Sequence, residues 1–122
     1  MKKLFSLLLA ATSLVGCQSN TEFKSVDAQQ FAEVIANQDV QLVDARTPEE
    51  FSEGHIPGAV NIDVKSADFD AQIAQLETSR PVAVYCRSGR RSKFAAERMT
   101  NAGLQVTELA DGILSWKGEV VK

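Results

Sequence analysis

The sequence feature that most constrains the fold is a cysteine placed where an apolar run stops and a helical pattern starts. The run at 82–85 reads Val-Ala-Val-Tyr, Cys86 follows it, and the helical pattern begins at about residue 92. Gly89 can take the positive φ that a short turn needs, and the first turn of a helix offers unpaired N–H groups that favour an anion. We therefore expect a strand, loop and helix unit with Cys86 at the mouth of an anion cradle.

The residues after Cys86 favour a reactive cysteine over a structural one. They include three positive charges, and the loop reads Arg87, Ser88, Gly89, Arg90, Arg91 and Ser92. A helix N-terminus and nearby arginines favour the thiolate over the neutral thiol. The alternative is a buried cysteine that acts as a small hydrophobe, which is common in proteins. That alternative gives no reason for three arginines and a glycine directly beside the thiol.

Length and charge restrict the classes of function. At 122 residues the chain has room for one domain. Its 13 basic and 16 acidic residues give a formal charge of -3, which does not suggest nucleic acid as a partner. The basic residues that matter are concentrated in the loop, so a small anion is the expected ligand. We expect a monomer without metal or cofactor.

The first residues have the pattern of an export signal. Lys2 and Lys3 precede an apolar segment, 4–15, that is too short to span a bilayer as a mature helix. Its end, Leu-Val-Gly-Cys at 14–17, resembles the bacterial lipobox, in which the signal is cut before a cysteine that becomes acylated, for example with palmitate. This predicts a removed signal (1–16), lipid on Cys17, a short tether (17–22) and one domain (23–122).

Two alternatives to the lipobox stay open: an ordinary secretory signal with an unmodified Cys17, and an uncleaved anchor. If Cys17 is acylated, Cys86 is the only free thiol of the mature chain, and no intrachain disulfide can form. The expected location is then the cell envelope, lipid-anchored and facing the periplasm. In a Gram-negative host, Gln18 after the lipid cysteine favours the outer membrane.

Hydrophobic periodicity predicts strands that alternate with helices. Strands are expected at 23–26, 40–44, 59–62, 82–86 and 104–109. The first helix is capped by Asp27 and closes near Asn37, and the second opens with a capping box formed by Thr47 and Glu50. Further helices are expected to start at Ser66 or Asp68, at about Ser92, and after Gly112. The helix from about Ser92 is expected to point four residues inward: Phe94, Ala95, Met99 and Ala102. This order predicts an α/β fold, with a mostly parallel central sheet of about five strands and helices on both faces.

Four motifs in order resemble the rhodanese family of sulfurtransferases. They lie at 44–51 (DARTPEEF), 54–59 (GHIPGA), 86–92 (CRSGRRS) and 109–112 (LADG) followed by Trp116. The resemblance covers the chain from Phe23 to Trp116. It implies the same α/β fold with helices on either side of the sheet.

The resemblance also implies a reaction. Cys86 would accept a sulfane sulfur from a donor such as thiosulfate, form a persulfide, and pass the sulfur to cyanide or a thiol, with no metal. Arg87 and Arg91 are the candidates for binding the sulfonate oxygens, whereas Arg90 points to solvent; a solvated loop is the alternative for all three. Ser88 and Ser92 either donate hydrogen bonds to bound sulfur or cap the helix, and for Ser92 the cap is favoured.

Three further residues are interpreted as supports rather than catalysts. Asp44 is expected to fix loop N–H groups or a basic side chain, and Arg46 to be partly buried with Glu53. His55 lies in the Gly-His-Ile-Pro-Gly turn, which favours a structural hydrogen bond over proton transfer. Trp116 is assigned to the core in preference to a wall of the sulfur site.

Two other classes of function are alternatives to sulfur transfer. Cysteine phosphatases and arsenate-type enzymes also hold an oxyanion in a loop from cysteine to arginine, but in those that share this fold the loop is longer. Here Arg91 closes a shorter loop, and the later position is Ser92. The other class is a persulfide carrier or sensor for an envelope partner, which differs from an enzyme only in its acceptor.

Overall fold

The computed structural model describes residues 22–122, which form one α/β domain. The predicted signal peptide and Cys17 lie outside the described residues. Five strands are present: β1 (Lys24–Val26), β2 (Gln41–Asp44), β3 (Val60–Asn61), β4 (Val82–Tyr85) and β5 (Val106–Leu109). The helices are α2 (Ala28–Ile35), α3 (Pro48–Glu53), α4 (Phe69–Ile73), α5 (Arg90–Asn101) and the 3-10 helix η2 (Ile113–Ser115).

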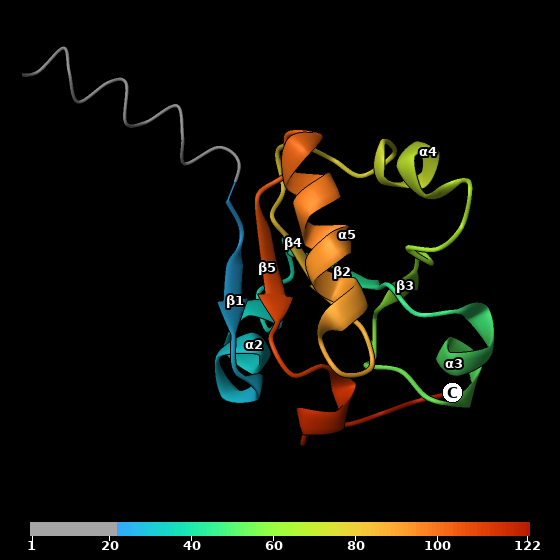
Figure 1. Ribbon diagram of the computed structural model, residues 1–122. Coiled ribbons are helices and arrows are strands. Elements are labelled where there is room, and N and C mark those ends of the chain that lie inside the picture. Colours follow the sequence, from blue (N-terminus) through green and yellow to red (C-terminus); the bar gives the residue numbers. More distant parts are fainter. Residues whose placement is uncertain (1–21) are drawn as a thin grey trace, which may run out of the picture.

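The strands form a parallel sheet in the order β1-β5-β4-β2-β3 (Figure 1). The central strand β4 pairs with β2 on one side and with β5 on the other, so both of its edges are hydrogen-bonded to neighbouring strands. All four of its residues are buried. The carboxyl ends of parallel strands lie at one edge of a sheet, where ligands bind in open α/β folds. Cys86 follows β4 at this edge.

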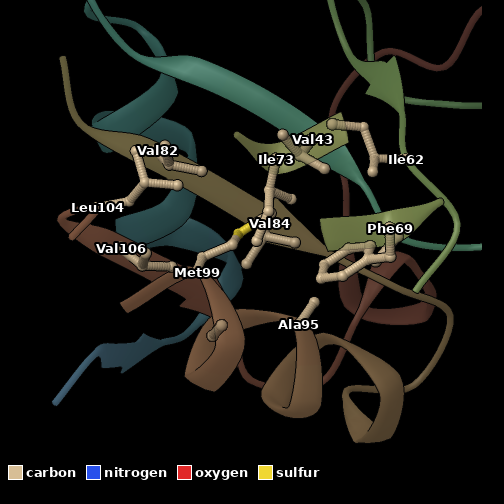
Figure 2. Packing of buried hydrophobic residues seen from close by; sticks show 12 residues of the cluster. Val43, Ile62, Phe69, Ile73, Val82, Val84, Ala95, Met99, Leu104 and Val106 are labelled. Carbon is tan, nitrogen blue, oxygen red and sulfur yellow. The ribbon is translucent and has the colours of Figure 1, made fainter. Parts of the chain in front are cut away.

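Two hydrophobic clusters show that helices cover both faces of the sheet. The larger cluster packs α4 and α5 against one face, where Phe69, Ala95 and Met99 meet the valines of β2, β4 and β5 (Figure 2). The second packs α2 and the region after β5 against the other face, with Phe31, Tyr85 and Leu109 at its centre. The predicted five-stranded sheet with helices on both faces is therefore confirmed.

Local signals placed the first helices correctly. Asp27 accepts a hydrogen bond from the backbone N–H of Gln30 and caps α2. Thr47 and Glu50 form the predicted capping box of α3, with Pro48 at its first position. These caps satisfy N–H groups that the helix itself cannot pair, which is why the chain turns into a helix at these points. The helix α3 ends at Gly54, where the chain turns back toward β3.

The inward face of α5 was predicted wrongly in part. The helix begins at Arg90, two residues earlier than expected, and its buried residues include Ser92, Ala95 and Met99. Phe94 and Ala102 are exposed instead. Ser92 is consequently not the cap of the helix: Gly89 occupies that position with a φ of 106°. Within residues 22–122, no helix is long and apolar enough to cross a membrane.

Candidate active site

The Sγ atom of Cys86 lies in a cradle of backbone N–H groups. It accepts hydrogen bonds from the N–H of Gly89 at 3.1 Å and of Ser92 at 3.2 Å. Cys86 is only 1% exposed and is the free cysteine of residues 22–122. N–H groups that converge on one atom at the start of a helix stabilise negative charge there. The loop of residues 86–91 is therefore built to hold an anionic sulfur.

The segment after β5 holds this loop from behind. The carbonyl of Cys86 accepts the N–H of Ile113 at 2.9 Å, and the carbonyl of Arg87 accepts the N–H of Leu114 at 3.2 Å. In Figure 1 this segment lies directly beside the turn that leads into α5. Gly112 makes the close approach possible, because a Cβ on it would lie 2.1 Å from the carbonyl oxygen of Arg87. The Asp-Gly pair at 111–112 thus has a packing role in the site.

A buried carboxylate supports the other side of the cradle. Glu108 of β5 is fully buried and accepts hydrogen bonds from the hydroxyls of Ser25 and, at 2.5 Å, Ser92. Lys93 lies 3.3 Å from the same carboxylate and donates to the carbonyl of Gly89 at 3.1 Å. Ser92 therefore presents its N–H to Cys86 while its side chain is fixed to β5. A charged side chain is rarely buried without partners, and Glu108 has three.

Sequence reasoning did not find Glu108. The available signal was a single carboxylate inside a strand of otherwise apolar pattern, in a sheet expected to be covered on both faces. Its partners come from β1 and α5, which are far away in sequence, so spacing alone could not identify them.

Arg91 forms a two-point ion pair with Glu50 of α3. Its Nη1 and Nη2 atoms lie 2.8 and 2.9 Å from the two carboxylate oxygens. Hydrogen bonds from Arg91 and Thr47 lower the pKa of Glu50 from 4.5 to about 2. The capping residue of α3 therefore also ties that helix to the loop, across 41 positions of sequence. Arg91 was a candidate for the donor's oxygens, and the structure places its guanidinium on Glu50.

We expect Glu50→Gln to lower the free energy of unfolding by about 1 kcal/mol near neutral pH, because a partly exposed two-point ion pair is lost. The folded pKa of Glu50 lies below the unfolded value, so its contribution is complete above pH 4.5 and is lost as the pH falls toward about 2. Urea unfolding of both proteins across this range measures the effect. A difference that grows on acidification would contradict the assignment.

The remaining polar residues of the loop are exposed. Arg87, Ser88 and Arg90 all reach solvent. Neither Arg87 nor Arg90 forms an ion pair within residues 22–122. Their guanidinium groups are thus free to meet an incoming anion, unlike that of Arg91.

The predicted supports Asp44 and Arg46 form a buried pair with each other. Nη2 of Arg46 lies 2.6 Å from Asp44 and donates to the carbonyl of Gly54 at 2.7 Å. The prediction that Arg46 pairs with Glu53 is wrong. Glu53 is exposed, and Arg46 contacts the backbone carbonyl of the next residue, Gly54, instead. The guanidinium also lies 5.7 Å from the ring centre of Tyr85. Burial, together with Asp44, raises the pKa of Tyr85, which stays a neutral phenol.

This pair and Tyr85 connect the central strand with the turn at 54–58. The phenol oxygen of Tyr85 accepts the N–H of Ile56 at 3.0 Å. His55 stacks on Phe51 and its Nδ1 lies 2.9 Å from the carbonyl oxygen of that residue. Its backbone pairs with Val121. The contacts of His55 are those of a structural residue in the turn, as its place in the motif suggested.

Trp116 packs on the far side of the sheet from α5. Its ring meets Phe31 edge-on at 6.3 Å, within the second hydrophobic cluster, and its Nε1 donates to the carbonyl of Glu119. Its side chain packs against the core but is only partly buried, so the predicted core position is met in part. Among residues 22–122, no group of three or more His, Cys, Asp or Glu side chains could hold a metal ion.

The fold and the loop define a class of protein: an α/β domain that presents a cysteine in an N–H cradle at the end of its central strand. The family model described as a rhodanese-like domain matches residues 27–119, more than half of the chain. The chain therefore belongs to the rhodanese-like domain family.

Individual relatives agree with this assignment. The thiosulfate sulfurtransferase GlpE of Pseudomonas syringae pv. syringae is 36% identical over 93 residues, which cover 75% of this chain and 84% of the relative. An HTH-type transcriptional regulator of Mycobacterium tuberculosis is 38% identical over 81 residues, 65% of this chain, but the chain spans only 35% of that protein. The crystal structure of a rhodanese-related protein from Thermoplasma volcanium has a TM-score of 0.72 and 29% identity, covering 81% of this chain and 98% of that one. Family membership and the similarity to the relative named as a sulfurtransferase support sulfurtransferase chemistry in general.

Proposed function

We propose that this protein is a thiosulfate sulfurtransferase that carries the sulfur as a persulfide on Cys86. The observation that carries the proposal is the convergence of the Gly89 and Ser92 N–H groups on Sγ, at 3.1 and 3.2 Å. Such donors stabilise a thiolate before the reaction and a persulfide after it. The similarity to a relative named as a thiosulfate sulfurtransferase supports the choice of donor.

In the first half of the reaction, the thiolate of Cys86 attacks the outer sulfur of thiosulfate. The S–S bond of thiosulfate breaks, sulfite leaves with the electron pair, and a persulfide remains on the enzyme. Arg87, the predicted donor-binding residue, is exposed and, like Arg90, has no ion pair within residues 22–122, so its guanidinium is available to meet the sulfonate oxygens. Arg91 contributes by fixing the loop to α3 rather than by binding the donor.

In the second half, cyanide or a thiolate attacks the outer sulfur of the persulfide, and Cys86 returns to the thiolate. No step needs a metal or an oxidant. The loop from Cys86 closes at Arg91, with Ser92 at the later position, and it is shorter than the oxyanion loop of the phosphatases that share this fold. This length supports sulfur rather than phosphate as the group that the loop holds.

Steady-state assays of the full chain separate these activities. With thiosulfate and cyanide, we expect thiocyanate to form, and we expect no hydrolysis of an aryl phosphate above background. Faster turnover of the aryl phosphate would favour a phosphatase. Formation of a persulfide without transfer to any acceptor would instead favour a carrier or sensor.

We further propose that lipid on Cys17 holds the domain at a membrane, with the active site on the periplasmic side. The support is the sequence of residues 2–17, with its basic start, apolar segment and Leu-Val-Gly-Cys end. A lipid-anchored protein needs no membrane-spanning helix in its folded domain.

Cys17→Ala is expected to shift the protein from the membrane fraction to the soluble fraction, because the acylated residue is removed. Fractionation of cells that produce the parent or the variant measures this, and Ser19→Ala is the matched control. Membrane retention of the Cys17→Ala protein would count against lipidation.

A further inference from the structure

A groove of about 590 Å³ lies next to the active-site loop and extends well beyond it. Ser88, Arg90 and Arg91 line the end that belongs to the loop and the first turn of α5. Lys65, from the segment between β3 and α4, lines one wall. The groove then continues along α5 to Arg98. Volumes of this size are typical of sites for small organic molecules.

The groove has an excess of positive charge. Four of its lining residues are basic, Lys65, Arg90, Arg91 and Arg98, and no carboxylate lines it. Arg91 is paired with Glu50, and Arg98 with Asp70 at 2.7 Å. Lys65 and Arg90 form no ion pair within residues 22–122. The two unpaired cations come from different segments, one before α4 and one at the start of α5, and both line the same groove.

An exposed aromatic side chain gives the groove an apolar wall. Phe94 is 59% exposed although it sits on a helix that buries its other face in the core. It is four residues from Arg90 and four from Arg98, so all three lie on one face of α5. A single exposed hydrophobic residue needs no explanation by itself. Here it stands between two cations in a groove that Ser88 of the active-site loop also lines.

We propose that this groove binds the sulfur acceptor, and that the acceptor is a peptide-sized thiol that carries carboxylates. The inference rests on the proposed sulfurtransferase function and assigns its second substrate. Thiosulfate is small enough to be held by the loop alone. Arg98 lies seven positions after Arg91, or about 10 Å along the helix, beyond the reach of the donor. Lys65 and Phe94 are therefore specificity residues for the acceptor.

The transfer step itself is balanced without another reactant. The acceptor thiolate attacks the outer sulfur of the Cys86 persulfide, and a new S–S bond forms on the acceptor. The S–S bond to Cys86 breaks, and its electron pair stays on Sγ as the thiolate. Carboxylates of the acceptor bound by Lys65 and Arg90 would orient its thiol toward the loop, which raises the effective concentration of the nucleophile.

The test compares acceptors at saturating thiosulfate, using the full chain. Glutathione serves as the peptide thiol with two carboxylates, 2-mercaptoethanol as a neutral thiol, and cyanide as a small acceptor. Lys65→Glu is expected to lower the ratio of kcat/KM for glutathione to that for cyanide about fivefold, because attraction becomes repulsion at a solvent-exposed position of the groove. Phe94→Ala is expected to lower it about threefold through lost apolar contact.

Lys24→Glu is the matched control. It makes the same charge change on β1. This strand forms one edge of the sheet, whereas β3, which precedes Lys65 in the chain, forms the opposite edge. We expect its ratio to stay within about twofold of the parent, since charges farther apart than a Debye length are screened.

The possible results separate this inference from the proposed function. A lower ratio for glutathione in Lys65→Glu, with no change for 2-mercaptoethanol, supports the groove as the acceptor site. Equal ratios in the Lys65→Glu and Lys24→Glu proteins overturn it while the sulfurtransferase proposal stands. Reduced thioredoxin is assayed as a fourth acceptor, and a fall in kcat/KM seen with it alone overturns the small-thiol assignment in favour of a protein occupant. Absence of transfer to every acceptor overturns both proposals.

Discussion

Cys86→Ser is expected to reduce thiocyanate formation from thiosulfate and cyanide by at least about 10⁴-fold, because the nucleophile that carries the sulfur is removed. Serine is the sharpest replacement. Its hydroxyl can accept the N–H groups of Gly89 and Ser92 that now point at Sγ. The cradle then keeps an acceptor, and the loss of activity reports on sulfur chemistry rather than on loop structure.

The fold should survive this change. Cys86 is buried, and exchange of a thiol for a hydroxyl with the same donors nearby should alter the free energy of unfolding by about 1–2 kcal/mol or less. Circular dichroism and urea unfolding check this point. Substantial turnover in a folded Cys86→Ser protein would show that another residue carries the sulfur.

Gly112→Ala is expected to have the second largest effect. Gly112 has a φ of 71°, and an added Cβ would lie 2.1 Å from the carbonyl oxygen of Arg87, which is backbone and cannot turn aside. The loop has to move. We expect a loss of about 3 kcal/mol in the free energy of unfolding, and of about 100-fold in kcat/KM for thiosulfate, because the cradle is displaced.

Gly58→Ala is the control that separates the cost of placing alanine at a positive φ from the cost of the steric contact with the loop. Gly58 also has a positive φ, 88°, but no atom lies within 4 Å of the Cβ position. It should lose about 1 kcal/mol of stability and retain activity. If both alanine variants lost activity to the same extent, the contact between Gly112 and the loop would not be what positions Cys86.

The parts of the fold that could be predicted from sequence are those set by neighbours along the chain. The caps at Asp27 and Thr47 depend on residues three positions away, and Cys86 follows a continuous apolar run that ends at the loop. The inward face of α5 could not be predicted from neighbours along the chain, because it depends on how the helix packs against the sheet. Gly89 rather than Ser92 caps the helix, and Phe94 is exposed.

The parts that could not be predicted are polar contacts between distant segments. Glu50 meets Arg91, and Glu108 meets Ser92, only because the parallel strands bring α3, α5 and β5 to one edge of the sheet. Composition showed that carboxylates were available, but not which would pair. The same pairings decide which arginines of the loop remain free for an anion: Arg91 is held by Glu50, a contact between segments that the sequence does not show.

The mass of the full chain after treatment with thiosulfate shows directly whether Cys86 carries the sulfur. The persulfide mechanism predicts a gain of one sulfur atom, located on the peptide that contains Cys86, which cyanide removes with formation of one equivalent of thiocyanate. The Cys86→Ser protein should gain no sulfur at that peptide. An unmodified Cys86 in protein that is turning over thiosulfate, or sulfur found only elsewhere in the chain, would contradict the persulfide mechanism.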